Sequence, residues 1–178
     1  MKTPWQHQHG SGDPFASPSG LKLTPTARNE HEHFMRQALA MAHQAAKLGE
    51  VPIGAVVVRN GQLVTSAHNW RETWNDPTAH AELIAIREAS KVLGGWRLED
   101  CTLYVTLEPC PMCAGAIVLS RIGNVYFGAK DEKGGAVVSK LHSFTPGLWN
   151  HDPNFHGGIL ADECGMILKD FFRGLRNS

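Results

Sequence analysis

Apolar residues recur at helical spacing along several stretches of the chain. Over 30–48 they return every three or four positions, which predicts an amphipathic helix that ends at Gly49. A second helix is expected to open at Pro77-Thr78, with the Thr78 hydroxyl as its N-cap. Further helices are expected over 112–119, 137–144 and 162–173. The predicted helices are therefore spread along most of the chain.

Short apolar and β-branched runs between these helices predict strands. The runs 53–58 and 62–67 flank Asn60-Gly61, a strong two-residue hairpin signal, so they should pair antiparallel. Three more strands are expected over 102–106, 123–128 and 155–160. Because helical crossovers lead to the later strands, we expect their pairs to be parallel. The pattern predicts a three-layer α/β/α fold, in which a mixed five-stranded sheet carries helices on both faces.

The N-terminal part of the chain differs in composition from the rest. Residues 1–28 are rich in Gly, Pro, Ser, His and Gln and lack an apolar period, so we interpret them as a flexible extension. His7 and His9 lack cysteine or carboxylate partners, and we expect them to be solvated. Of the 178 residues, 42% are hydrophobic, which suffices for one core. Residues 29–178 are therefore predicted to form a single domain.

Charge and composition narrow the possible functions. The 17 basic side chains of Lys and Arg equal the 17 acidic ones, so nucleic-acid binding would need a local basic patch. No apolar run is long enough to span a bilayer, and residues 1–20 lack the apolar centre of a secretory signal. We therefore expect a cytoplasmic protein without membrane contact. In that reducing compartment, clustered cysteines more often bind metal or catalyse than form disulfides.

Two short motifs carry the candidate chemistry. His80 is followed by Glu82, and Cys110 by Cys113 three positions later. One imidazole and two thiolates suit Zn²⁺ in a tetrahedral site whose fourth place is left to water. A structural zinc site would usually close with a second cysteine pair, whereas Cys101 and Cys164 are isolated. The motifs therefore predict one catalytic zinc ion per chain, held by His80, Cys110 and Cys113.

Glu82 is the candidate acid/base of this site. Residues i and i+2 of a helix point to different sides, so Glu82 is unlikely to share the metal with His80. A carboxylate in that place is better suited to move protons to and from a metal-bound water. The two motifs in this order are the signature of zinc-dependent nucleobase deaminases.

Further blocks around the motifs resemble the bacterial tRNA adenosine deaminase family. The metal motif alone would also suit cytidine, cytosine or guanine deaminases. The resemblance covers about 30–176, and its blocks are 50–56, Asn69, 76–82, 102–110, 112–116, 120–122, 127–129, 158–164 and 170–173.

This resemblance implies a cytidine-deaminase-like fold and hydrolytic deamination of adenosine to inosine at the wobble position of a tRNA anticodon, with arginine tRNA as the expected substrate. It implies that a zinc-activated hydroxide attacks C6 of adenine while Glu82 moves protons to N1 and the leaving ammonia. It also implies a homodimer that binds a tRNA anticodon stem-loop. The substrate-binding residues implied are Asn69, Ala81, Asp131, Asn150, His151, Phe172 and Arg173.

Simpler interpretations stand beside these roles. Asn69 could be a turn residue, Asp131 could be part of a solvated face, and Phe172 could be core. A guanine or cytosine/cytidine deaminase acting on free bases or nucleosides would share every metal residue. A tRNA-binding subunit without catalysis should lack the acid/base carboxylate, and the presence of Glu82 argues against it.

Overall fold

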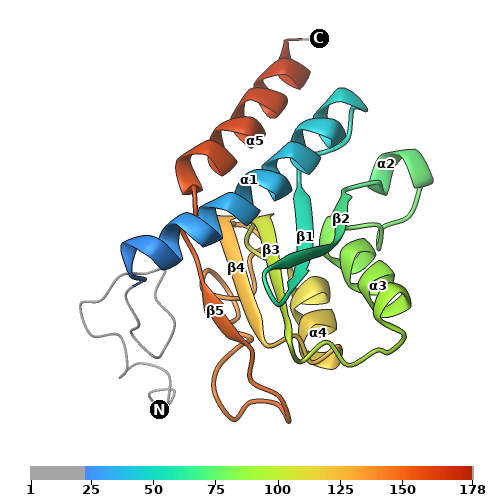
Figure 1. The fold of residues 1–178 in the computed structure, drawn as a ribbon. Coiled ribbons are helices and arrows are strands. Elements are labelled where there is room, and N and C mark those ends of the chain that lie inside the picture. Colours follow the sequence, from blue (N-terminus) through green and yellow to red (C-terminus); the bar gives the residue numbers. More distant parts are fainter. Residues whose placement is uncertain (1–22, 178) are drawn as a thin grey trace, which may run out of the picture.

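A computed structural model describes residues 23–177 of the chain. Its centre is a five-stranded sheet with the strand order β2-β1-β3-β4-β5. The strands are β1 (Gly54–Arg59), β2 (Gln62–His68), β3 (Cys101–Leu107), β4 (Asn124–Ala129) and β5 (Asn154–His156). The helices are α1 (Pro25–Lys47), α2 (Arg71–Trp74), α3 (Ala81–Leu93), α4 (Pro111–Leu119) and α5 (Ala161–Arg176). Helices α1 and α5 cover one face of the sheet and α3 and α4 the other, which confirms the predicted three layers (Figure 1).

The hairpin between β1 and β2 forms as predicted. Asn60 and Gly61 have φ values of 50° and 71°, the positive values that a tight two-residue hairpin turn needs at both positions. The two strands pair antiparallel. The pairs β3–β4 and β4–β5 are parallel, also as predicted.

One strand pair contradicts the prediction that all later pairs are parallel. Strand β3 pairs with β1, and this pair is antiparallel. The crossover through α3 makes β3 run in the direction of β2, but β1 lies between them in the sheet. Five of the six residues of β1 are buried, so this strand requires an interior position with a neighbour on each side.

Two hydrophobic cores join the layers. Ala55 and Val57 of β1 belong to the core under α3 and α4, whereas Val56 and Val58 belong to the core under α1 and α5. This division follows from the alternation of side chains along a strand. Helix α1 crosses the start of β1 so closely that a Cβ on Gly54 would lie 2.0 Å from the carbonyl oxygen of Ala38. Only glycine therefore permits this contact.

The first helix starts earlier than the sequence pattern indicated. Helix α1 begins at Pro25, and the Thr24 hydroxyl caps it by accepting a hydrogen bond from the Ala27 N–H at 3.2 Å. Residues 25–28 are therefore part of the folded domain, which corrects the boundary drawn at residue 28. Residues 1–22 of the predicted extension, with His7 and His9, lie outside the described residues 23–177.

Three other predicted elements differ in the structure. Segment 137–144 forms turns because the N–H groups of 137–139 donate to a buried carboxylate and not to a helical ladder. Helix α3 begins at Ala81 and not near Thr78, whose N–H and hydroxyl both bind the Asp76 carboxylate. Strand β5 ends at His156, before the left-handed Leu160 that precedes α5. No helix within residues 23–177 has the length and apolar character to cross a membrane.

Candidate metal centre and active site

Two helix N-termini bring the predicted metal ligands together. His80 is the N-cap residue of α3, Cys110 is that of α4, and Cys113 lies in the first turn of α4. Pro111 occupies the first helical position and so starts α4 directly after Cys110. The free N–H groups and the dipoles at these helix ends favour anionic side chains, and therefore thiolates.

The distances between the three donor atoms fit a tetrahedral zinc site. His80 Nδ1 lies 3.6 Å from Sγ of Cys110 and 3.6 Å from Sγ of Cys113. Zn–N bonds of about 2.0–2.1 Å and Zn–S bonds of about 2.3 Å, at the tetrahedral angle, separate such donors by about 3.6 Å. The three atoms all lie within 4.8 Å of one another, and in residues 23–177 no other group of His, Cys, Asp or Glu side chains converges in this way.

The two remaining cysteines do not complete a four-ligand site. Cys101 is buried in the core under α3 and α4, and Cys164 is buried in the core under α1 and α5. Burial raises the pKa of both thiols. They behave as small apolar residues, and neither adds a fourth protein ligand to the group of His80, Cys110 and Cys113.

The pKa values of the two ligand thiols are shifted in opposite directions. The hydrogen bond with Cys113 lowers the pKa of Cys110 to about 4, and the contact with His80 adds to this effect. The pKa of Cys113 is raised, because it shares the hydrogen bond with Cys110 and because it is buried. The hydrogen bond with Cys110 also raises the pKa of His80. The protein alone thus favours one thiolate, and a divalent cation would favour the second.

Glu82 is buried beside these ligands. It lies in the first turn of α3 and is 4% exposed. Burial raises the pKa of its carboxyl to about 7, and the neighbouring Cys110 adds to the shift. Its oxygens are not part of the converging group of donors, in agreement with the helical spacing. A carboxyl whose pKa lies near neutrality can both accept and release a proton.

Glu108 organises the loop after β4, a role that the sequence analysis missed. Its Oε1 accepts hydrogen bonds from the N–H groups of 137–139, and its Oε2 accepts from the Asp131 N–H and the Ser139 hydroxyl. Burial opposes ionisation, but these hydrogen bonds hold the pKa of Glu108 below its ordinary value. A Cβ on Gly135 would lie 2.3 Å from this carboxyl. The carboxylate therefore ties loop 131–139 to the segment that carries Cys110.

Asn69 is fixed by a second buried carboxylate, that of Glu50. The Asn69 amide donates to Glu50 Oε2 at 3.4 Å, and its Oδ1 accepts from the Arg71 N–H at 3.3 Å. Glu50 also accepts from the N–H groups of Glu72 and Thr73 in α2. These contacts are those of a turn residue, and a role of Asn69 toward a substrate stays a prediction.

Asp131 lies on the same edge of the sheet as the metal ligands. Its N–H is bound by Glu108, while its Oδ1 accepts from the N–H groups of Lys133 and Gly134 at 3.0 and 3.1 Å. The side chain thus closes its own turn at the C-terminal end of β4. The contact of Asp131 with a substrate stays a prediction.

Asn150 and His151 lie far from the metal ligands of their own chain. The Asn150 side chain accepts from Arg121, which follows the C-terminal end of α4, and His151 Nε2 lies 2.7 Å from the Ile122 carbonyl oxygen. Cys110 precedes the N-terminal end of the same nine-residue helix, so a helix length of about 13 Å lies between. The structure therefore does not bring Asn150 and His151 into the centre formed by His80, Cys110 and Cys113.

Phe172 and Arg173 take part in a basic groove. Phe172 is 43% exposed, whereas its neighbour Phe171 is half-buried, so Phe172 is not a core residue. The groove joins the end of α5 to the loop after β4, and its lining residues are Lys133, Leu168, Lys169, Phe172, Arg173, Leu175 and Arg176. Four basic side chains, Lys133, Lys169, Arg173 and Arg176, thus form a local basic patch of the kind that nucleic-acid binding would need.

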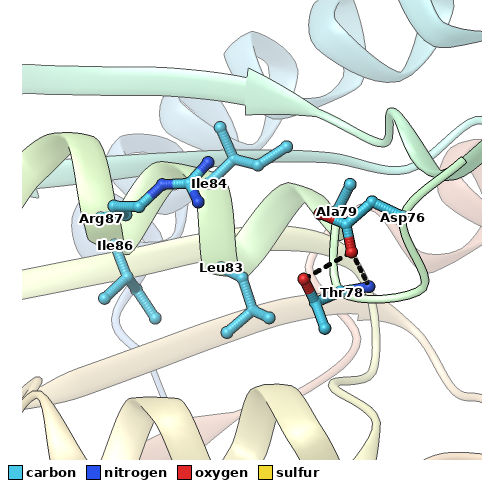
Figure 2. A pocket seen from close by; sticks show the side chains of 7 residues that line it. All are labelled: Asp76, Thr78, Ala79, Leu83, Ile84, Ile86 and Arg87. Carbon is cyan, nitrogen blue, oxygen red and sulfur yellow. Dashed lines mark hydrogen bonds between the residues drawn. The ribbon is translucent and has the colours of Figure 1, made fainter. Parts of the chain in front are cut away.

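A second pocket lies beside the start of α3. Its lining residues are Asp76, Thr78, Ala79, Leu83, Ile84, Ile86 and Arg87. Figure 2 shows that the Asp76 carboxylate holds the Thr78 hydroxyl and N–H, which fixes the turn before His80. Ala81 follows His80 and is fully buried, and the predicted contact of its backbone with a substrate stays a prediction.

Comparisons with known proteins agree with this site. Residues 29–176 match the family model of the MafB19-like deaminases. The tRNA-specific adenosine deaminase of Bacillus subtilis (strain 168) is 52% identical over 147 residues, which span 83% of this chain and 91% of that protein.

Solved structures point the same way. A structure from studies of A-to-I editing by tRNA:A34 deaminases superposes with a TM-score of 0.74 at 46% identity, over 76% of this chain and 99% of that one. A guanine deaminase from Bacillus subtilis superposes with a TM-score of 0.54 at 46% identity, over 56% of this chain and 64% of that one. The longer and closer matches decide the relationship: the chain belongs to the family of bacterial tRNA-specific adenosine deaminases.

Proposed function

We propose that this protein hydrolytically deaminates adenosine to inosine at the wobble position of a tRNA anticodon, with arginine tRNA as the substrate. The observation that carries the proposal is the convergence of two thiols on one imidazole, each at 3.6 Å, with the buried Glu82 carboxyl in the first turn of α3. Relatives named tRNA-specific adenosine deaminase span most of the chain and support adenosine in tRNA as the substrate.

His80, Cys110 and Cys113 are the residues that would hold one zinc ion per chain. Zinc supplies a nucleophile at neutral pH by lowering the pKa of a coordinated water. Glu82, buried beside these ligands, would hold the proton and move it to N1 of adenine and to the leaving amino group. Its burial keeps bulk water away from the carboxyl during these transfers.

The neighbouring loops position the nucleoside. The Asn69 side chain, held by Glu50, and the backbone at Ala81 bind the flipped adenosine. Asp131, on the loop that Glu108 holds, contacts the flanking ribose. Phe172 and Arg173 bind the stem-loop with the basic side chains of their groove. We expect the protein to act on tRNA in the cytoplasm.

A guanine deaminase is the second candidate, because a structure of that activity is 46% identical over part of the chain. We expect efficient turnover of an anticodon stem-loop with a wobble adenosine and poor turnover of adenosine, guanine or cytosine alone. An RNA editor uses binding energy from the neighbours of the flipped base to position the reacting carbon. Inosine or ammonia release from each substrate decides between the two. Equal turnover of a free base and the stem-loop would exclude the tRNA substrate.

The basic groove supplies variants for the same assay. Lys133→Ala and Arg173→Ala should weaken stem-loop binding and reduce its salt dependence, because each removes a phosphate contact. Zinc content should not change. Arg97→Ala is the matched control, since this exposed arginine lies after the C-terminal end of α3 and stacks on Trp96.

We also propose a homodimer in which both chains shape each RNA site. The outer side of α4 is apolar: Met112 and Ala116 are partly exposed, Leu119 is 71% exposed, and a Cβ at Gly115 would meet nothing within 4 Å. A second copy packed there would also explain why Asn150 and His151 lie at the opposite end of α4 from their own metal ligands. Sedimentation at micromolar concentration should give twice the mass of 19.5 kDa. A species of monomer mass would contradict the dimer.

A further inference from the structure

Three aromatic side chains form a continuous stack between the core and the surface. The rings of His68 and Trp70 lie 4.5 Å apart at 29°, and those of Trp70 and Trp74 lie 5.3 Å apart at 9°. His68 is buried, Trp70 is half-buried, and Trp74 is 47% exposed. The stack therefore ends in an indole ring that solvent, or a ligand, can reach.

This stack is fixed next to the metal centre. The backbone N–H of Trp70 donates to the backbone carbonyl oxygen of Ala79 at 3.0 Å, and Ala79 directly precedes the ligand His80. Trp74 closes the short helix α2, whose Glu72 and Thr73 N–H groups are bound by the buried Glu50 carboxylate. In Figure 1, α2 lies beyond the N-terminal end of α3, in the same upper half of the molecule as the C-terminal part of α5.

We propose that Trp74, backed by Trp70, is a stacking platform for an anticodon-loop base that neighbours the deaminated adenosine. The inference rests on the proposed function, because it names how that same site holds its RNA. A nucleotide that turns out of a loop leaves its neighbour without a stacking partner. Proteins bind such unstacked bases on the faces of aromatic rings, and they do so largely without sequence preference.

The charges around the platform favour a base over a phosphate. Arg71 is the basic residue of α2, and its guanidinium forms an ion pair with the Glu72 carboxylate at 3.0 Å. The two charges cancel, so α2 carries no net positive charge beside the Trp74 ring. Phosphate contacts then belong to the groove at the end of α5, where four basic side chains gather. The platform should contribute to affinity through stacking, with little dependence on salt.

The test is a double-mutant cycle between Trp74 and the bases of the loop. Binding is measured for the full-length zinc-loaded protein with an intact anticodon stem-loop, and with stem-loops that are abasic at one loop position each. Trp74→Ala and Trp74→Leu should each weaken binding of the intact stem-loop by roughly 5- to 150-fold, whereas Trp74→Phe should retain most of the affinity. One abasic position should cause a similar loss with the wild type and no further loss with Trp74→Ala. The salt slope should not change.

Trp96→Ala is the matched control. Trp96 is 54% exposed and contacts a cation, Arg97, at 4.4 Å, but it follows the C-terminal end of α3, away from His80. Its replacement should leave stem-loop affinity unchanged. Zinc content of every variant reports whether the fold around the site is retained.

The outcomes separate this inference from the proposed function. A wild-type protein that deaminates the stem-loop while Trp74→Ala and Trp74→Leu bind it equally well would overturn the platform alone. The platform would also be overturned if Trp74→Ala lowered the affinity by the same factor for the intact stem-loop and for every abasic one. A Trp74→Ala protein that sediments as a lighter species would likewise assign the Trp74 ring to protein packing and overturn the platform. A wild type that binds no stem-loop would overturn the platform and the proposed function together.

Discussion

Replacement of Glu82 by alanine should abolish turnover while the fold and the zinc content stay nearly intact. Glu82 lies outside the group of three metal donors, so its loss removes no ligand. It is the buried carboxyl beside that group, with a pKa raised to about 7, and so the group suited to move protons. A general acid/base typically contributes about 10²- to 10⁴-fold to the rate. The expected result is therefore a fall of that size in kcat for the stem-loop.

Glu82→Gln separates proton transfer from packing. Glutamine keeps the side-chain volume at a position that is 4% exposed, but its amide cannot release and accept the proton. Both variants should bind the stem-loop with an affinity close to that of the wild type. A Glu82→Gln protein that kept more than about a tenth of the activity would contradict the role, since acid/base contributions are larger than that.

Loss of a metal ligand should have an equally large effect by a different route. His80→Ala or Cys113→Ser removes one of three donors whose 3.6 Å spacing matches tetrahedral zinc. We expect metal analysis to find close to one zinc ion per chain in the wild type and close to none in either variant. Turnover should disappear with the metal, because the water then keeps its ordinary pKa.

The control for this experiment is a cysteine elsewhere in the fold. Cys101→Ala changes a buried thiol in the core under α3 and α4, and its zinc content should match that of the wild type. Unchanged zinc in His80→Ala or Cys113→Ser would remove that residue from the ligand set. Stem-loop binding, measured in parallel, would show whether the basic groove still forms without the metal.

The sequence by itself determined the chemistry of the site and most of the elements. The imidazole, the two thiols and the carboxyl are set by short spacings, because a cap residue and the first turn of a helix lie close together in any chain that starts a helix there. The Asn60-Gly61 hairpin follows for the same reason, since its turn depends on two residues that tolerate positive φ. The apolar run 53–58 also predicted the strand β1, five of whose six residues are buried.

Only the tertiary structure decided which distant segments meet. Glu108 binds residues 23 to 31 positions further along, and Glu50 binds residues up to 23 positions away, so neither role has a local signal in the sequence. The pairing of β3 with β1 also has no local signal in the sequence, because it depends on how β1 is buried between two neighbouring strands. Asn150 and His151 match the family pattern, yet they lie a helix length from the metal ligands of their own chain. Local spacing fixes which atoms a short segment presents, whereas the packing of whole layers fixes which segments face one another.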